Sequence, residues 1–393
     1  MKDSVSAQPG YFAPEDCNLD DLKALTAQET TPEQAPRAAE ILKNIPVYQM
    51  HDISADLADE KTRAQLMAEW AGILLTGPGV LVLRGACRNS GALDRASQVF
   101  EEIIAAEKSA GGEGADHFAA SGANDRIWNA LQKLCERDPE TFMHCFASPG
   151  IDAVCEAWLG KGYQMTAQVN LVHPGGAAQL AHRDYHLGFQ TSEVSAAFPA
   201  HVHALSPVLT LQGAVAHMDM PVESGPTRLL PFSQAYLPGY AAWRLEDFRA
   251  YFEENSVQLP LEKGDALFFS PALFHAAGAN ISSDIHRLAN LLQISSPFGR
   301  AMETVDRTSM CKLLYPHISN AAVNGTLSVA ERAAAIAAVA EGYSFPTNLD
   351  LDPPSGGLAP QTQQAFFHQA LEEDLDADTF ADRLDQMDAR RLP

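Results

Sequence analysis

A histidine and an aspartate that stand two positions apart form the first pattern in this sequence with the means to do chemistry. On an extended strand, the side chains of His182 and Asp184 point to the same side and can share one ion. An imidazole and a carboxylate are two of the three ligands of a facial triad, which leaves three positions of an octahedral metal open for reactants. The pair therefore predicts a mononuclear metal site, provided that a second histidine completes it.

The third ligand has to come from a distant part of the chain, because a flat strand cannot supply three ligands to one face of an octahedron. His275 suits this role, since it follows the apolar run 266–269, which is typical of a buried strand. Arg287 stands a short way downstream, at the start of a second strand-like run, 288–295. A hairpin between His275 and Arg287 would place a guanidinium near the metal, where it could bind a carboxylate through two hydrogen bonds.

Two other pairs compete for the metal. His217 and Asp219 repeat the spacing on a strand-like run, but no arginine follows them in a matching place. His201 and His203 lie in a segment that reads as a loop, and they lack a neighbouring carboxylate. We expect neither pair to be the metal site, although His217 remains a candidate for contact with a substrate.

The elements that must position these residues change in character along the chain. Residues 1–45 read as an N-terminal arm, and residues 46–160 as a helical region with one strand, at 79–84, that packs on the core. Residues 161–300 alternate short runs of Val, Leu, Thr and Phe with turn-forming residues, as in a jelly roll. Residues 301–393 read as a helical extension with a Pro/Gly-rich stretch that is a possible lid. The expected class is α+β, with a jelly-roll core wrapped by N- and C-terminal helices.

Two local patterns predict where helices begin. Ser328 and Glu331 form a capping box ahead of an Ala-rich run. Thr31, Pro32 and Gln34 give a similar signal near the N-terminus, with proline at the first helical position.

Composition and charge limit the class of protein. No apolar run approaches the roughly 20 residues that a membrane-spanning helix needs, and a net charge of -23 opposes binding to a phosphate backbone. The N-terminus has neither a signal-peptide nor a transit-peptide pattern, and the six cysteines form no CxxC pair. We therefore expect a cytoplasmic protein that acts on a small molecule and binds neither nucleic acid nor membrane. The oligomeric state is not encoded in any pattern we find.

Four motifs in a fixed order carry a resemblance to a known family. They are Gln179-x-x-His182-x-Asp184, Glu223-Ser224-Gly225-Pro226-Thr227, Lys263-Gly264-Asp265-Ala266, and His275 with Arg287. Over roughly residues 160–300 the chain resembles the phytanoyl-CoA dioxygenase family of iron(II)/2-oxoglutarate oxygenases. The resemblance implies a double-stranded β-helix that holds Fe(II) through His182, Asp184 and His275, with Arg287 paired to the 5-carboxylate of 2-oxoglutarate. It also implies that 2-oxoglutarate and O2 are cosubstrates, and that an unactivated carbon is hydroxylated with release of succinate and CO2.

Further candidate site residues follow from this resemblance and from closeness in sequence. Gln168 and Asn170 lie on the preceding strand, and similar positions in the family help to hold 2-oxoglutarate. The candidates for substrate contact are Tyr185, His186, Phe189, His217 and Arg228. The family's arginine commonly stands one residue closer to the distal histidine, where this chain has His286. We expect Arg287 to take the role, because an imidazole cannot supply a permanent fork of donors.

Two other functions remain open on the same ligands. One is a cupin-like metalloenzyme that works without 2-oxoglutarate, and the other is a non-catalytic metal-binding sensor. The presence of Asp184 argues against the halogenating relatives, in which a small residue replaces the carboxylate.

Overall fold

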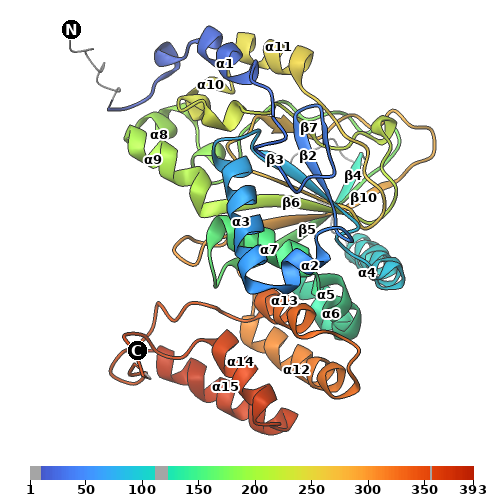
Figure 1. Cartoon of the computed structure of the whole chain (residues 1–393), viewed down its shortest axis with the longest axis vertical. Coiled ribbons are helices and arrows are strands. Elements are labelled where there is room, and N and C mark those ends of the chain that lie inside the picture. Colours follow the sequence, from blue (N-terminus) through green and yellow to red (C-terminus); the bar gives the residue numbers. More distant parts are fainter. Residues whose placement is uncertain (1–9, 111–122, 355) are drawn as a thin grey trace.

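The computed structural model describes residues 10–110, 123–354 and 356–393 of the chain. A sheet of eight strands runs through the molecule in the order β1-β2-β3-β8-β6-β10-β5-β4 (Figure 1). Neighbouring strands are antiparallel, except for β2 and β3, which are parallel. The strands of this sheet are β1 (Glu40–Leu42), β2 (Ile45–Gln49), β3 (Val80–Arg84), β4 (Asn124–Ile127), β5 (Gln164–Val172), β6 (Thr210–Ala216), β8 (Ala266–Phe269) and β10 (Arg287–Ser295). A second, two-stranded sheet consists of β7 (Arg228–Leu229) and β9 (His275–Ala276).

Single bridges extend this small sheet on both sides. His182 pairs with His275 of β9, and Val257 pairs with Leu229 of β7. Four segments from distant parts of the chain therefore lie next to one another, in the order 182, β9, β7, 257.

A hydrophobic cluster fills the space between the two sheets. Leu229 and Leu273 pack there with Val82, Leu267 and Ala289 of the large sheet. Because side chains alternate along a strand, the odd-numbered residues of β10 face this cluster and the even-numbered ones join a larger core beneath helices. We call the side of the large sheet that faces the small sheet its inner face.

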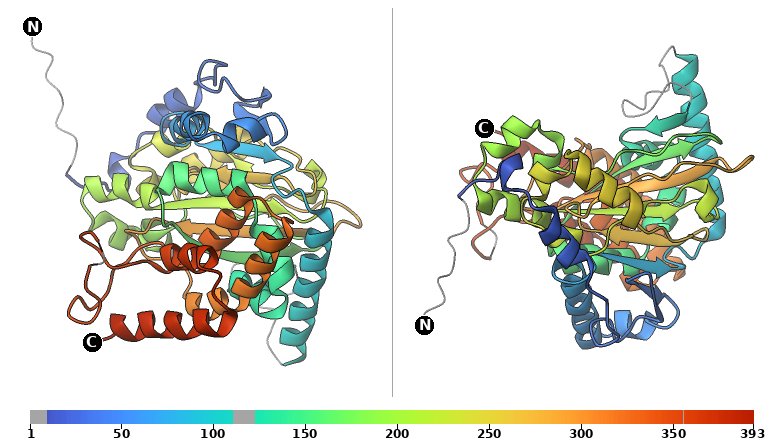
Figure 2. Two further views of the ribbon diagram at one scale, coloured as in Figure 1. Left: turned by 60° about the horizontal axis from the view of Figure 1, so that its bottom comes forward. Right: turned by 90° about the horizontal axis from the view of Figure 1, so that it is seen from above.

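Helices cover the outer face and both ends of the sheet. A C-terminal group, α12 to α15, lies at one end of the molecule, and α1, α10 and α11 lie at the opposite end (Figure 1, Figure 2). The helices are α1 (Leu19–Thr26), α2 (Ser54–Ala58), α3 (Glu60–Leu75), α4 (Ser90–Ser109), α5 (Ala130–Arg137), α6 (Pro139–Phe146), α7 (Pro149–Leu159), α8 (Ser192–Ala196), α9 (Ala200–Leu205), α10 (Gly239–Ala242), α11 (Glu246–Asn255), α12 (Arg307–Asn324), α13 (Val329–Val339), α14 (Gln363–Glu372) and α15 (Ala377–Arg391).

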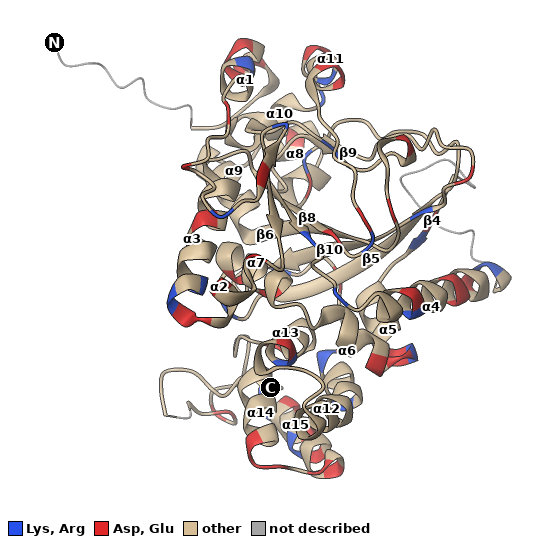
Figure 3. Cartoon of the chain, turned by 45° about the vertical axis from the view of Figure 1, so that its right-hand side comes forward, with Lys and Arg blue, Asp and Glu red and all other residues tan. Residues whose placement is uncertain are grey.

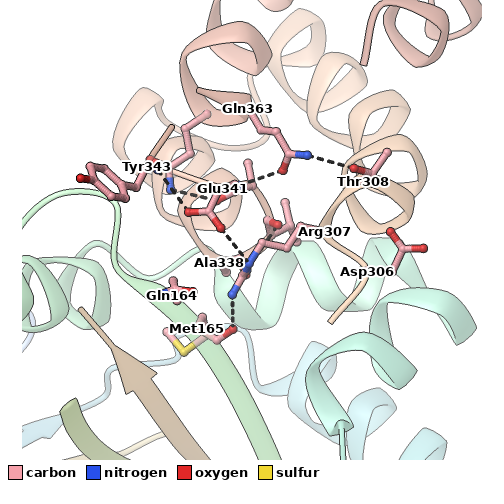
Figure 4. Close-up of polar contacts among 12 residues, drawn as sticks. Gln164, Met165, Asp306, Arg307, Thr308, Ala338, Glu341, Tyr343 and Gln363 are labelled. Carbon is pink, nitrogen blue, oxygen red and sulfur yellow. Dashed lines mark hydrogen bonds and ion pairs between the residues drawn. The ribbon is translucent and has the colours of Figure 1, made fainter. Parts of the chain in front are cut away.

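Arg307 joins the C-terminal helices to strand β5 of the large sheet. Its guanidinium donates to the carbonyl oxygen of Met165 on β5 at 3.0 Å and to that of Ala338 on α13 at 3.4 Å, and lies 3.9 Å from the Glu341 carboxylate (Figure 4). A buried guanidinium is stable only when its donors are satisfied. The C-terminal group is therefore fixed to the first residues of β5, and not merely tethered by the chain.

The two predicted helix starts have different outcomes. The capping box of Ser328 and Glu331 is confirmed, because it opens α13. The helix expected from Thr31 is wrong, since the chain forms turns there even though the Thr31 N–H donates to Gln34. The physical reason is Pro36, which could not donate the backbone hydrogen bond that the next turn of a helix requires.

The sheet also recruits strands from outside the β-rich part of the sequence. Strand β3 occupies the run predicted at 79–84, but the edge strand β4 was not expected, because its four residues are mostly polar and show no apolar alternation. Charged residues gather on peripheral helices such as α4, α11 and α15, and the strands carry few of them (Figure 3). No helix in the described part of the chain has both the length and the apolar character needed to cross a bilayer.

Candidate metal centre

His182, Asp184 and His275 meet at one point, although His275 comes from a distant part of the sequence. One ligand atom from each residue lies within 4.8 Å of the other two. The Nε2 atom of His275 is 3.2 Å from Oδ2 of Asp184, and Nε2 of His182 is 3.6 Å from Oδ1. This donor set, two imidazoles and one carboxylate, fits a single borderline-hard divalent metal. Within the described ranges, no other group of three such side chains qualifies.

Backbone pairing brings the two histidines together. Their amides and carbonyls form the reciprocal bonds of an antiparallel bridge, at 3.0 and 3.2 Å, and their ring centroids are 4.4 Å apart. The Nδ1 atom of His182 lies 2.8 Å from the carbonyl oxygen of Leu180, and Nδ1 of His275 lies 2.8 Å from that of Leu273. A carbonyl oxygen only accepts, so each Nδ1 carries the proton and each Nε2 is left with a lone pair for a metal.

The charges of the three groups support one another. Burial would raise the pKa of Asp184, but the imidazoles of His182 and His275 outweigh burial and hold that pKa well below its ordinary value. Burial and the neighbouring His182 lower the pKa of His275. Metal ligands must be deprotonated to bind, and these two shifts favour that state, whereas the Asp184 carboxylate outweighs burial and raises the pKa of His182.

Arg287 begins β10 and faces inwards. It is buried, and its Nη1 donates to the carbonyl oxygen of Ser224 at 3.2 Å. Burial alone lowers its pKa to about 10, with no contribution from a carboxylate, so the guanidinium stays charged at neutral pH. His286 faces the other way, where its exposed ring lies with Nδ1 2.8 Å from Nδ1 of His173. Of the two neighbouring candidates for carboxylate binding, only Arg287 therefore points into the core.

Gln168 and Asn170 lie on the inner face of β5. They are register partners of Leu291 and Ala289 on β10. Gln168 accepts a hydrogen bond from Arg126 at 3.0 Å, whereas the buried Oδ1 of Asn170 has no partner. Asn170 is therefore the one of the two with a free hydrogen-bonding atom.

Tyr185, His186 and Phe189 form a group directly after Asp184. The backbone of Tyr185 and His186 adopts positive φ values of 61° and 43°, a strained turn that tends to occur at functional sites. The centroid of the Tyr185 ring lies 5.8 Å from that of the Phe189 ring, and Phe189 is 49% exposed. The buried hydroxyl of Tyr185 has no hydrogen-bond partner. The group therefore follows a metal-ligand candidate directly in the chain and combines an exposed aromatic ring with a buried, unpartnered hydroxyl.

Two other candidates are not brought to the triad. His217 directly follows β6 and points to the outer face of the sheet, where its Nδ1 is 3.0 Å from the Ser97 hydroxyl of α4. Arg228 binds the Glu253 carboxylate at 2.6 Å and also the Ser256 hydroxyl. His217 is thus a core residue and Arg228 a surface anchor.

Three residues near the site carry no signal in the sequence. Gln212 of β6 donates from Nε2 to Oδ2 of Asp184 at 2.5 Å. Met302 lies with its sulfur 3.8 Å from Nε2 of Gln168, and Glu303 accepts from the Asn129 amide at 2.7 Å. Met302 and Glu303 stand in a connecting segment ahead of α12, where nothing local distinguishes a site residue from any loop residue.

Comparison with known proteins places the chain in a family. The family described as "Phytanoyl-CoA dioxygenase (PhyH)" matches residues 76–289, which is more than half of the chain and includes the triad and Arg287. The chain therefore belongs to the phytanoyl-CoA dioxygenase family of iron(II)/2-oxoglutarate-dependent oxygenases. This membership confirms the resemblance found in the sequence, and with it the prediction of iron(II) and 2-oxoglutarate as the cofactors of the family.

Individual relatives are more distant. The dioxygenase andF of Emericella variicolor is 29% identical over 143 residues, which is 35% of this chain and 45% of that protein, so less than half of its length is matched. The epimerase SnoN of nogalamycin biosynthesis has 21% identity and a TM-score of 0.39, over 60% of this chain and 84% of its own. The SnoN complex with Fe3+, alpha ketoglutarate and nogalamycin RO gives 19% identity and a TM-score of 0.40, over 60% and 85%.

Proposed function

We propose that this protein is an iron(II)/2-oxoglutarate-dependent oxygenase, with His182, Asp184 and His275 as its metal ligands. The main support is the meeting of the three ligand atoms within 4.8 Å of one another, in a chain of this family. Two histidines with fixed tautomers and one ionised carboxylate are the donors that iron(II) takes in such sites.

We further propose that the core is a double-stranded β-helix. The strands β8, β6, β10 and β5 are consecutive neighbours in the large sheet, and they lie opposite the four segments of the small sheet. The hydrophobic cluster between them contains residues of both sheets. Such an arrangement gives a closed interior, with metal ligands on one wall and a binding surface on the other.

Arg287 is the proposed anchor for the 5-carboxylate of 2-oxoglutarate. It stands on the same inner face as Gln293, and Gln293 is the register partner of Gln212, which touches Asp184. Between the two ends of this row the inner face of β6 and β10 carries Ala214, Ala216 and Ala289, together with the larger Leu291. A charged guanidinium without a carboxylate partner, at the far end of a wall of mostly small residues, suits an elongated dicarboxylate whose other end reaches the triad.

The proposed reaction is hydroxylation of an unactivated carbon in a small molecule. When bound, iron and 2-oxoglutarate supply the oxidation, with succinate and CO2 as products, and the protein positions the substrate and excludes water. Tyr185, His186 and Phe189 are the proposed substrate contacts, because they directly follow Asp184 and include a buried hydroxyl with no partner. Their side chains would select a substrate that combines an apolar surface with a polar group.

An anaerobic spectroscopic titration tests this function. Adding iron(II) and then 2-oxoglutarate to the protein without oxygen should produce a weak visible charge-transfer band. Asp184→Ala should abolish the band, whereas Asp219→Ala, in the other His-x-Asp pair, should keep it. A well-folded wild-type protein that shows no band would refute the proposal. Oxygen consumption that does not depend on 2-oxoglutarate and is unchanged in the Arg287→Ala variant would favour a metalloenzyme of another class.

A further inference from the structure

Gln212 is a polar residue of β6, and every residue of the strand after it is apolar. It lies on β6 with its side chain on the inner face, and the next two inward positions of the strand are Ala214 and Ala216. Only 6% of Gln212 is exposed. A buried amide is costly unless a hydrogen bond compensates for its lost water, so its partner should explain its presence.

That partner is the Asp184 carboxylate. Nε2 of Gln212 lies 2.5 Å from Oδ2 of Asp184, whereas Oε1 of Gln212 has no hydrogen-bond partner. A carboxylate only accepts hydrogen bonds, so the amide must turn its NH2 group towards Asp184. The orientation of the Gln212 amide is therefore set by Asp184 and by no other described group.

Metal binding would leave Gln212 as the side-chain donor to Asp184. His275 now lies with Nε2 3.2 Å from the same Oδ2, but a histidine that gives its Nε2 lone pair to a metal has no proton there to donate. The same holds for Nε2 of His182, 3.6 Å from Oδ1. Among the residues that the structure describes, only the Gln212 amide then still donates from a side chain to Asp184.

We propose that Gln212 is a positioning residue for the metal centre. It holds Oδ2 of Asp184, so that the carboxylate presents Oδ1 as the metal ligand and does not turn both oxygens to the ion. This inference rests on the proposed function, because it requires that Asp184 binds a metal. Outer hydrogen bonds of this kind are typically worth 10- to 100-fold in metal affinity.

Gln293 provides a matched control. It is the register partner of Gln212 on β10, it faces the same way, and it is 7% exposed. Its Oε1 is also without a partner, but no hydrogen bond joins it to Asp184. The two glutamines are thus equally buried and are paired across neighbouring strands, but only Gln212 contacts the proposed metal ligand Asp184.

Titration with Co(II) alone, without 2-oxoglutarate or oxygen, separates a positioning role from a packing role. Gln212→Met should weaken Co(II) binding by about 10- to 100-fold, and at saturating metal it should shift the visible Co(II) bands, which report the ligand geometry. Gln293→Met should leave both unchanged. Thermal unfolding checks that each variant is folded. If the Gln212→Met variant does not fold, Gln212→Leu takes its place in the titration.

A double-mutant cycle with Asp184→Ala decides how Gln212 acts. In the Asp184→Ala background, Gln212→Met should have no further effect on Co(II) affinity, because its target is gone. Equal effects of Gln212→Met and Gln293→Met, or additive effects of Gln212→Met and Asp184→Ala, would overturn the inference while leaving the proposed function intact. Absence of Co(II) binding in the wild-type protein would instead overturn the proposed function.

Discussion

The chain contains the same three-residue pattern twice, and the two copies have different environments. His182 forms a β-bridge with His275, and one ligand atom from each of His182, Asp184 and His275 lies within 4.8 Å of the other two. His217 turns to the helix α4, where it contacts Ser97, while Asp219 accepts a hydrogen bond from the Lys263 amide at 2.9 Å. The first pair belongs to a cluster that could hold a metal ion, whereas the two residues of the second pair have separate structural roles.

The position of each histidine relative to the sheet explains the difference. His217 directly follows β6 and continues the outward-facing positions of Leu211 and Val215, so its ring meets α4 and not the interior between the two sheets. His182 is instead held extended by its backbone bonds to His275, which also bring in the third ligand. The spacing of two therefore makes a metal site possible, and the pairing with a third segment brings the three candidate ligand atoms together.

Replacing one histidine of each pair with alanine should give the largest difference between the two pairs, in iron(II) binding and in stability. His182→Ala removes a proposed metal ligand, so binding of iron(II) and the charge-transfer band should be lost, with little change in stability. His217→Ala should keep the band but destabilise the fold by about 1–3 kcal/mol, because it removes a buried ring and the hydrogen bond between that ring and Ser97. Iron(II) titration and urea unfolding of both variants measure the two effects. Loss of the charge-transfer band in a folded His217→Ala protein would show that His217 also contributes to the metal site.

The neighbours His286 and Arg287 extend the comparison to the proposed 2-oxoglutarate end of the site. Arg287→Lys keeps the charge but loses the fork of donors, so the KM for 2-oxoglutarate should rise by about 10- to 100-fold, in line with the loss of a charge-assisted hydrogen bond. His286→Ala should leave this KM unchanged, since the ring points to His173 at the surface. Succinate release as a function of 2-oxoglutarate concentration measures both. An unchanged KM in Arg287→Lys would place the anchor elsewhere.

The two patterns should also differ in their response to acid. Burial lowers the pKa of His217 from 6.5 to about 4, so the folded state holds the neutral ring while the unfolded state takes up a proton below pH 6.5. The contribution of His217 to stability is therefore present at pH 7 and falls as the pH drops from 6.5 towards 4, by about 2 kcal/mol at pH 5. The pKa of His182 is raised, because the nearby Asp184 outweighs burial, so its contribution in the metal-free protein has the opposite sign and is lost as the pH rises.

Urea unfolding of the metal-free protein at pH 7.5 and pH 5 tests this prediction. His217→Gln should unfold with a smaller loss of stability between the two pH values than the wild-type protein does. An equal loss in both proteins would show that His217 is not held neutral in the core.

Much of the site was accessible from the sequence because its key signals are local. His275 follows a buried strand, Arg287 begins another, and Gly79–Arg84 reads as a strand without any knowledge of its neighbours. Gln212 and Glu303 were not accessible, because their roles depend on what lies opposite them and not on the residues beside them. The failed helix at Thr31 shows the same limit at short range, where one favourable signal was outweighed by Pro36.

The sequence by itself determined the types of ligand, the period of two that aligns His182 with Asp184, and the order of motifs that marks the family. The tertiary structure alone decided which His-x-Asp pair meets a third ligand, that Arg287 and not His286 faces inwards, and that Gln212 touches Asp184. The physical reason is that alternation along a strand is a local property of the backbone. Which face is enclosed, and by what, depends on pairing between segments that lie far apart in the chain.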